Sequence, residues 1–357
     1  MARLDEMFRL MHAEGASDLH LSAGSRPVLR IRGDMERFGT GVLQQEELKA
    51  MLYEIAPPDK IETFEKTGDA DFAYEIPELA RYRCNYFRQK NGIGAVFREI
   101  PSRIIPLEQL GIPPVLKDLA LLPRGLVLVT GPTGSGKSTT LAAILDYANE
   151  KRKSHIITIE DPIEFVHTGK AAVINHREIG THTRSFASAL RAALREDPDI
   201  ILVGEMRDLE TTALAIEAAN TGHLVFATLH TMGATRTVDR IIDQFPAEQQ
   251  QQIRMSLSES LKAVISQTLF KRIDRKGRIA AIEILFCNVA ASNLIREEKT
   301  FQLMTVIQTS RKLGMISMDD SIMELLLKKW IGPEEAYEKA SDKKRFLPLL
   351  KSPPPEW

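Results

Sequence analysis

The first part of the chain alternates between helical and strand-like spacings of apolar residues. Apolar side chains recur at helical spacing over residues 2–14, which predicts a short amphipathic helix. Its apolar stripe consists of Leu4, Met7, Phe8 and Met11. Leucine and valine then alternate with polar residues on both sides of the Gly-Ser turn at 24–25, the pattern of two paired strands. A second helix is predicted near 45–56, where Pro57-Pro58 would end it.

Residues 81–100 carry a strong hairpin signal. Arginine and asparagine alternate with tyrosine and cysteine over 81–86, and the Asn91-Gly92 pair favours a tight turn between two strands. Residues 1–100 are therefore predicted to form a small α+β domain. A linker is predicted over residues 101–118, because prolines are concentrated there. They are Pro101, Pro106, Pro113 and Pro114.

Beyond the linker, uninterrupted apolar runs alternate with helical stretches. The runs are LVLVT, IITIE, IILVGE and LVFATLH, and a helix is predicted among them at 185–196, ending before Pro198. Apolar runs without polar alternation are typical of parallel strands buried on both faces, so residues 119–350 are predicted to form an α/β domain. From about 247 the pattern is mostly helical, with one strand pair near 268–286. Residues 351–357 are expected to be a disordered tail.

Composition narrows the class of protein. The 357 residues suffice for two domains, and 43% hydrophobic with 27% charged residues is usual for a soluble globular chain. A formal net charge of -1 gives no basic excess for nucleic acid, and Cys84 and Cys287 fit neither a disulfide framework nor a CxxC metal site. The N-terminus lacks the apolar core of a signal peptide, and no membrane span is predicted. We therefore expect a cytoplasmic location, with any membrane reached through partners.

In the stretch GPTGSGKST, residues 131–138 match the pattern G-x-x-x-x-G-K-[ST] in full. It follows a predicted strand and opens an Ala/Leu-rich helix, the context in which backbone N–H groups cradle phosphate oxygens. We therefore predict ATP binding, with Lys137 reaching the β- and γ-phosphates and the Ser138 hydroxyl holding Mg²⁺. The predicted phosphate-binding residues are Gly131, Pro132, Thr133, Gly134, Ser135, Gly136, Lys137, Ser138 and Thr139.

Three other predicted strands end in polar side chains. IITIED supplies Glu160 and Asp161, IILVGE supplies Glu205, and LVFATLH supplies His230. Ligands of a parallel α/β sheet lie beyond the carboxyl ends of its strands, so these groups are expected beside the phosphates. Glu205 is the candidate to orient the attacking water, and His230 to sense the terminal phosphate.

The predicted strand IILVGE has one unusual feature. The generic phosphate-loop pattern has an aspartate just before this glutamate, but position 204 is glycine. Glu160 or Asp161 is therefore expected to reach Mg²⁺ through water. A single strand-end carboxylate could equally be a cap or a surface salt bridge, so the prediction depends on the joint pattern at one sheet edge.

The four motifs, in this order, resemble those of the secretion-ATPase superfamily of type IV pilus and type II secretion motors. GPTGSGKS is similar to its Walker A motif, IEDPIEF to its Asp box, ILVGEMRD to its atypical Walker B motif and TGHLVFATLHT to its His box. ASDLHL near the N-terminus and SNLIREEKT at 292–300 extend the likeness over nearly the whole chain. The likeness is strongest to the pilus-retraction branch of the superfamily.

This resemblance implies a hexameric ring whose subunits have an N-terminal PAS-like domain and a C-terminal RecA-like ATPase domain. ATP turnover would drive removal of pilin through an inner-membrane platform protein, with no direct contact to nucleic acid. By motif position, Glu205 is the implied catalytic glutamate, Glu160 the Asp-box acid and His230 the His-box histidine. Arginines of the N-terminal domain are implied to approach the nucleotide, and the pool comprises Arg81, Arg83, Arg88 and Arg98.

Some positions depart from the family pattern. AASNLIRE stands where the signature usually reads AIRNLIRE, so Ala291 and Ser292 replace Ile and Arg in a motif tied to retraction. His176 stands where Gln is common.

Several alternative functions remain at this level. A pilus-assembly or type II secretion motor is the nearest one, although such chains are typically longer and often carry a tetracysteine zinc site. A retraction accessory paralogue is a second. Alternatives of another class are a nucleic-acid translocase, which the net charge disfavours, and a nucleotide-binding regulator without turnover, which Glu205 disfavours.

Overall fold

The protein divides into two compact units in a computed structural model that describes residues 2–31, 33–39, 41–100 and 103–350. One unit comprises the chain up to Arg103 together with Glu164–Val166, and the other comprises Ile104–Ile163 and the chain from His167 onward. The predicted tail, residues 351–357, lies outside the described residues, as do residues 101–102 of the predicted linker. Within the described part of the chain, no helix is long and apolar enough to cross a membrane.

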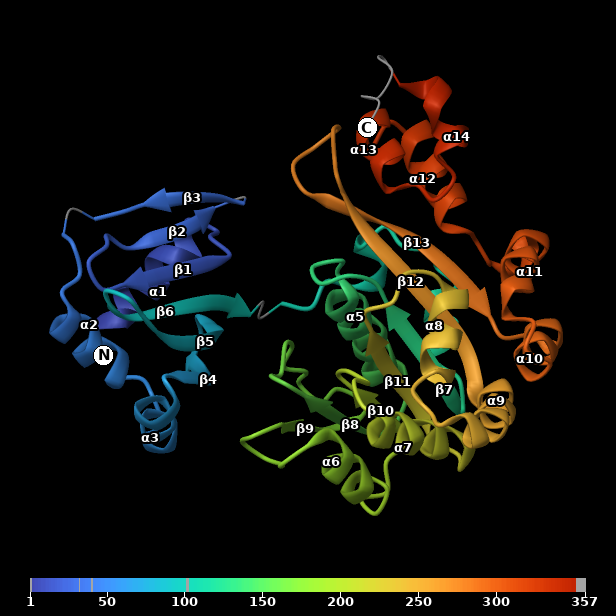
Figure 1. The fold of residues 1–357 in the computed structure, drawn as a ribbon, viewed down its shortest axis with the longest axis horizontal. Coiled ribbons are helices and arrows are strands. Elements are labelled where there is room, and N and C mark those ends of the chain that lie inside the picture. Colours follow the sequence, from blue (N-terminus) through green and yellow to red (C-terminus); the bar gives the residue numbers. More distant parts are fainter. Residues whose placement is uncertain (1, 32, 40, 101–102, 351–357) are drawn as a thin grey trace. The chain divides into compact units, whose positions relative to one another are not determined.

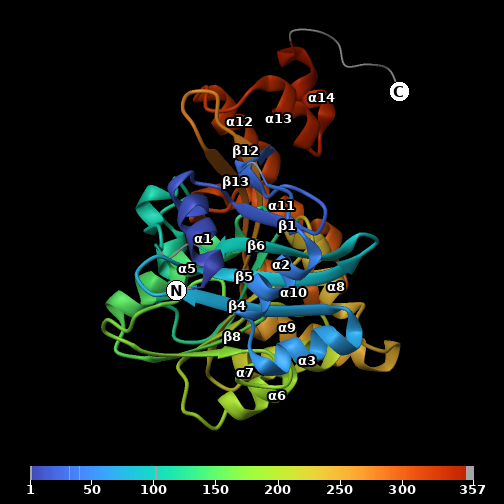
Figure 2. The same cartoon turned by 90° about the vertical axis from the view of Figure 1, so that its left-hand side faces the viewer.

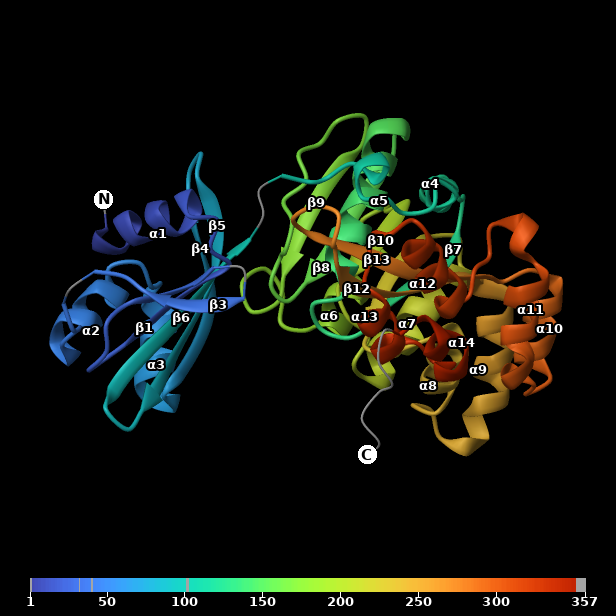
Figure 3. The same ribbon diagram turned by 90° about the horizontal axis from the view of Figure 1, so that it is seen from above.

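The N-terminal unit is built on a six-stranded antiparallel sheet with the order β3-β2-β1-β6-β5-β4 (Figure 1). Figure 2 shows β1, β6, β5 and β4 following one another in this order. The strands are β1 (Asp18–Ser22), β2 (Val28–Ile31), β3 (Asp34–Arg37), β4 (Asp69–Ile76), β5 (Ala80–Gln89) and β6 (Gly92–Ile100). The helices are α1 (Arg3–Ala13), α2 (Gln45–Tyr53) and α3 (Pro58–Thr67), gathered to one side of the sheet in Figure 3.

The core of this unit explains the period-two pattern of its strands. Alternate residues of β5 turn inward, so that Tyr82 and Tyr86 are buried while Arg81 and Arg83 lie on the other face. Phe8 of α1 stacks on Tyr82, with ring centroids 4.2 Å apart. The predicted helix over 2–14 and both predicted hairpins are confirmed. The sequence reading missed α3 because Pro58, expected only to end a helix, occupies the first turn of the next one.

The C-terminal unit contains a seven-stranded sheet with the order β13-β12-β7-β11-β10-β8-β9 (Figure 1). Its strands are β7 (Gly125–Thr130), β8 (His155–Glu160), β9 (Val173–Glu178), β10 (Ile200–Val203), β11 (Leu224–Leu229), β12 (Leu261–Lys271) and β13 (Arg278–Phe286). Every residue of β7, β10 and β11 is buried, as the uninterrupted apolar runs predicted. Because β7 is covered on both faces, Leu126 and Leu128 pack into one core and Val127 and Val129 into another.

Helices flank this sheet and continue beyond it. They are α4 (Leu116–Ala120), α5 (Lys137–Lys151), α6 (Phe186–Ala193), α7 (Leu209–Asn220), α8 (Ala234–Ile242), α9 (Ala247–Ser260), α10 (Val289–Arg296), α11 (Leu303–Thr309), α12 (Met318–Leu327), α13 (Pro333–Lys339) and α14 (Lys343–Phe346). The core that contains Val127 includes residues of α4 and α5, whereas the core that contains Leu126 includes residues of α6 to α11. The predicted α/β fold class, with a smaller α+β N-terminal part, is confirmed.

The strand pair expected near 268–286 differs from the prediction in one respect. It begins at Leu261, and β12 joins the main sheet in parallel with β7. The far end of this hairpin lies beside α12, α13 and α14 (Figure 1), where Phe270 and Ile279 share a core with Ile322 and Phe346. The β12–β13 hairpin therefore connects the centre of the sheet to the C-terminal helices.

Candidate active site

The loop between β7 and α5 has the backbone of a phosphate cradle. Its glycines adopt positive φ angles of 141° at Gly131, 78° at Gly134 and 88° at Gly136, a region that side chains disfavour. A Cβ at position 131 would lie 2.4 Å from the carbonyl oxygen of Gln267, so only glycine fits there. Gly136 is the N-cap of the 15-residue helix α5, and no side chain caps that end. The first N–H groups of α5 and its dipole therefore suit a bound anion.

Lys137 lies against the same loop. Its side chain is buried, and Nζ donates hydrogen bonds to the carbonyl oxygens of Gly131, at 2.9 Å, and Pro132, at 3.1 Å. Among the described residues, Ser135 has a buried hydroxyl oxygen with no hydrogen-bond partner in the chain. A buried polar atom of this kind needs an explanation, and a ligand in the loop supplies one. The chemistry of the loop therefore fits the phosphates of a nucleotide.

Strand register brings the predicted strand-end groups to one edge of the sheet. The last pair between β11 and β7 is Leu229 with Thr130. The residues that follow, His230 and Gly131, therefore lie just beyond the ends of two neighbouring strands. β8 and β10 pair at Ile159 and Val203, so Glu160 and Gly204 follow side by side. In the order β7-β11-β10-β8, all three predicted groups lie at the carboxyl ends of adjacent strands.

Glu205 makes two polar contacts at this edge. One carboxylate oxygen lies 3.1 Å from Nε2 of His230, and the other lies 2.7 Å from the guanidinium of Arg207. Burial raises the pKa of Glu205, but the hydrogen bond and charge of Arg207, with the contact to His230, outweigh burial and leave the pKa below its ordinary value. The carboxylate is therefore ionised near neutral pH and held in a defined orientation.

Arg207 was not among the predicted site residues. It stands two positions after Glu205 in the stretch ILVGEMRD, and a basic residue so close to the candidate carboxylate was the available signal. The pKa of Arg207 is raised first by its hydrogen bond to Glu205 and, less strongly, by the charge of Asp161. Asp161 thus lies within electrostatic reach of the Glu205–Arg207 pair.

Gly204 has a steric reason for being glycine. A Cβ at this position would lie 3.1 Å from the carbonyl oxygen of Ile159 and 3.3 Å from Cα of Glu160. The peptide is also fixed from both sides, because its N–H donates to Ile159 and its carbonyl accepts from the hydroxyl of Thr228. An aspartate, which the generic pattern has here, would push β10 away from β8.

We expect Gly204→Ala to lower the free energy of unfolding by about 1–3 kcal/mol, the usual cost of crowding a packed position. Urea unfolding of both proteins would measure the change. Gly41→Ala is the matched control, because a Cβ at position 41 meets no atom within 4 Å. Equal unfolding midpoints for the two variants would contradict the steric explanation.

Glu160 is buried at the end of β8 beside His176 of β9. Nδ1 of His176 lies 4.0 Å from the carboxylate of Glu160 and 2.8 Å from the hydroxyl oxygen of Thr158. The backbone N–H of His167 donates to Nε2 of the same ring at 3.1 Å. His176, which departs from the family pattern, therefore joins β8 to the chain segment that follows Glu160. Asp161, in contrast, is exposed.

The four predicted arginines all lie on β5 and β6 of the N-terminal unit. Arg83 and Arg98 are opposite one another in the strand register. Arg83 lies 3.9 Å from Asp71, and Arg98 lies 2.7 Å from the buried carboxylate of Asp18. Arg81 lies on the same face as Arg83, two residues along β5.

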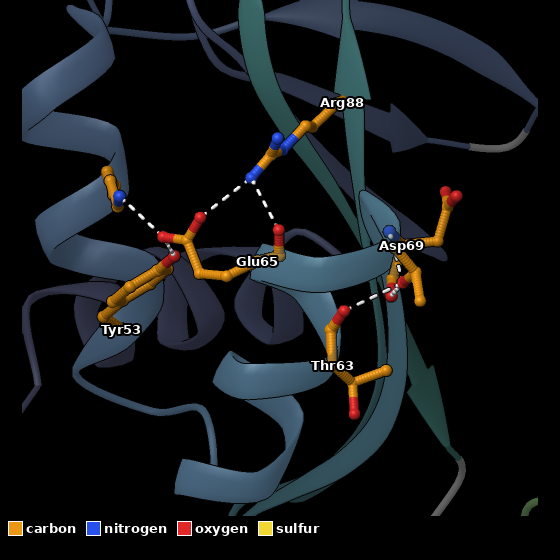
Figure 4. Close-up of polar contacts among 7 residues, drawn as sticks. Tyr53, Thr63, Glu65, Asp69 and Arg88 are labelled. Atoms are coloured by element: carbon orange, nitrogen blue, oxygen red, sulfur yellow. Dashed lines mark hydrogen bonds and ion pairs between the residues drawn. The ribbon is translucent and has the colours of Figure 1, made fainter.

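Arg88 lies on the opposite face of β5, where it belongs to a separate polar cluster (Figure 4). Its guanidinium contacts the carboxylate of Glu65 at 2.8 Å, and Lys49 and Tyr53 contact the same carboxylate. Hydrogen bonds from Lys49, then Tyr53, lower the pKa of Glu65 to about 2. Arg88 is thus engaged within its own unit, on a different face from the other three arginines.

The departures in the C-terminal motif lie on α10. Ala291 is fully buried, and the hydroxyl of Ser292 lies 3.4 Å from the sulfur of Cys287. Asn288 caps the helix by accepting a hydrogen bond from the N–H of Ala291. Both substituted positions therefore belong to the packed start of α10.

A buried polar side chain on β12 supports the phosphate loop and was missed by the sequence reading. Nε2 of Gln267 donates to the carbonyl oxygen of Ser135 at 2.7 Å. The available signal was the polar pair Ser266-Gln267 within the apolar run AVISQTLF.

Comparison with known proteins places the chain among secretion and pilus ATPases. Residues 2–311 match the family model described as type II/IV secretion system protein. The chain is 52% identical over 343 residues to the type IV pilus retraction ATPase PilT of Pseudomonas aeruginosa, covering 96% of this chain and 99% of that one. It is 37% identical to the type IV pilus ATPase PilU of the same organism, covering 97% and 91%. The crystal structure of the pilus retraction motor PilT with bound ADP superposes with a TM-score of 0.89 at 43% identity, covering 97% and 98%.

Proposed function

The chain belongs to the type II/IV secretion system protein family, and on this premise we propose that it is the ATPase that powers type IV pilus retraction and twitching motility. The observation that carries the proposal is the 52% identity to PilT along 96% of this chain and 99% of that one. Identity to the second pilus ATPase, PilU, is 37% over a similar span, which favours the PilT-like role.

The nucleotide is held by the loop 131–136 and the start of α5. Backbone N–H groups donate hydrogen bonds to the phosphate oxygens, and Lys137 exchanges its two carbonyl partners for oxygens of the β- and γ-phosphates. Ser138 and, through water, Glu160 or Asp161 would hold Mg²⁺, which would neutralise phosphate charge when bound. We assign nucleotide contact to the N-terminal arginines as a group; Arg83 and Arg98 share one face of the sheet, whereas Arg88 lies on the other.

Hydrolysis depends mainly on orientation of the attacking water, because phosphoryl transfer needs positioning more than covalent chemistry from the protein. Glu205 supplies an ionised carboxylate that Arg207 and His230 hold from two sides. His230 leaves β11 beside the phosphate loop, so the same imidazole contacts Glu205 and senses the terminal phosphate. A change at the phosphate is thereby transmitted to the catalytic carboxylate.

The proposed working form is a homohexamer at the cytoplasmic face of the inner membrane. An inner-membrane platform protein receives the work and removes pilin, and no nucleic acid takes part. Light scattering with Mg-ATP is expected to give a mass about six times the 40.0 kDa of one chain. A strict monomer with ATP present would count against the ring.

Deleting the gene and counting surface pili tests the direction of work. Excess pili that do not retract are expected, because removal of pilin would stop while assembly continues. Cells without pili would instead indicate a pilus-assembly motor. Loss of a secreted protein with normal pili would indicate a type II secretion motor.

A further inference from the structure

Two buried polar side chains of the β12–β13 hairpin accept hydrogen bonds from the backbone that follows His230. Ser266 and Glu283 are opposite each other in the strand register, and they are only 1% and 2% exposed. The hydroxyl of Ser266 accepts a hydrogen bond from the N–H of Gly233 at 2.9 Å. A carboxylate oxygen of Glu283 accepts one from the N–H of Ala234, the first residue of α8, at 2.7 Å. The loop from His230 to α8 is therefore anchored at its far end.

The second carboxylate oxygen of Glu283 has a different partner. It accepts a hydrogen bond from the N–H of Met318, the first residue of α12, at 3.3 Å. Next to Glu283, Ile284 exchanges backbone hydrogen bonds with Ile316. The residues just before α12 therefore pair with the edge of β13. One buried carboxylate thus joins the N-termini of α8 and α12.

Both oxygens of Glu283 therefore face a helix N-terminus and accept a backbone N–H there. A carboxylate can accept at each oxygen, and the positive ends of two helix dipoles point toward it. Burial raises the pKa of Glu283 above its ordinary value, and the hydrogen bonds from the N–H groups of Ala234 and Met318 offset only part of this rise. Since a buried charge is costly unless its partners are in place, the geometry of both helix ends is strongly constrained.

We propose that Glu283 is a positioning residue for ATP hydrolysis, which with Ser266 sets the position of His230 and couples the His230 loop to the C-terminal helices α12–α14. The inference rests on the proposed ATPase function. Glu283 lies on β13 and acts through the backbone between His230 and Ala234. A movement of α12 would pull on the same carboxylate, so a load on the C-terminal helices reaches the imidazole that contacts Glu205.

Glu283→Gln tests the proposal because it keeps the volume and removes one acceptor. An amide presents one oxygen and one NH₂ group, so an N–H of Ala234 or Met318 must face another donor. Hydrogen exchange of the amides from Thr231 to Arg236 is expected to accelerate about tenfold or more, while amides of β7 keep their rates. Unchanged exchange at 231–236 would overturn the proposal, and this result is independent of ATP turnover.

Kinetics separate positioning from a general loss of structure. In Glu283→Gln, kcat is expected to fall about 10- to 100-fold while KM for ATP stays the same, because a small displacement of a catalytic group is enough. In a His230→Ala background the same substitution is expected to have little further effect on kcat. An equal loss in both backgrounds would overturn action through His230.

Glu338→Gln, an exposed change on α13, is the matched control and is expected to leave both readouts at the parent values. A parent protein without ATP turnover would refute the proposed function, and the exchange result would still decide the anchoring role of Glu283.

Discussion

Replacing Glu205 with glutamine is expected to abolish nearly all ATP turnover while ATP binding persists. Glutamine has nearly the same shape, but it cannot carry the negative charge that we propose orients and polarises the attacking water. Loss of a positioned general base typically costs about 100- to 10,000-fold in rate. Phosphate release with saturating Mg-ATP would measure turnover, and calorimetric titration with ATP would measure binding; Glu205→Ala is expected to behave in the same way.

The control for this substitution is Glu210→Gln, an exposed position on α7 near Glu205 in the sequence. It is expected to keep parental turnover, because its carboxylate is exposed and pairs with the exposed Arg191. Parental turnover in Glu205→Gln would refute the catalytic assignment. Loss of ATP binding together with turnover would show that Glu205 acts in binding rather than in hydrolysis.

The pH dependence of turnover gives an independent check on the same carboxylate. The pKa of Glu205 lies below its ordinary value of 4.5, so protonation of this group should reduce the rate only in more acidic solution. Arg207→Gln removes the cation that lowers the pKa, so the acid limb of the kcat profile is expected to move to higher pH. An unshifted acid limb would show that Arg207 does not tune the catalytic group.

Replacing Lys137 with alanine is expected to weaken ATP binding and to reduce turnover. The ammonium group is buried, and in the proposed complex it makes charge-assisted hydrogen bonds to phosphate oxygens, whose loss costs about 10- to 100-fold in affinity. Calorimetric titration with ATP and with ADP would measure the change. The loss should be larger for ATP, because Lys137 is assigned to the γ-phosphate as well as the β-phosphate.

Lys151→Ala is the matched control for this experiment, since Lys151 is an exposed lysine in the last turn of the same helix. It is expected to leave ATP affinity at the parental value. If Lys137→Ala bound ATP as tightly as the parent protein, the assignment of the phosphate loop would be contradicted. An equal loss for ATP and ADP would contradict only the contact to the γ-phosphate.

The sequence by itself determined the features that depend on local chain geometry. The phosphate loop needs glycines at set positions, a strand before it and a helix after it, and all of these lie within residues 125–151. The β5–β6 hairpin likewise follows from two alternating runs around Asn91-Gly92. Parallel strands buried on both faces were recognisable because their apolar runs are uninterrupted.

Only the tertiary structure decided which distant side chains meet. The contact between Glu205 and His230 depends on β10 and β11 being neighbours, and strand order in a parallel sheet is not encoded in the spacing along one strand. The reason for glycine at position 204 is the carbonyl oxygen of Ile159, which only the packing of β10 against β8 brings beside it. Glu283 gained its role because packing against α8 and α12 brings two N–H groups to one carboxylate. Local pattern sets the elements, whereas contacts between residues far apart in the chain follow from how those elements bury their apolar faces together.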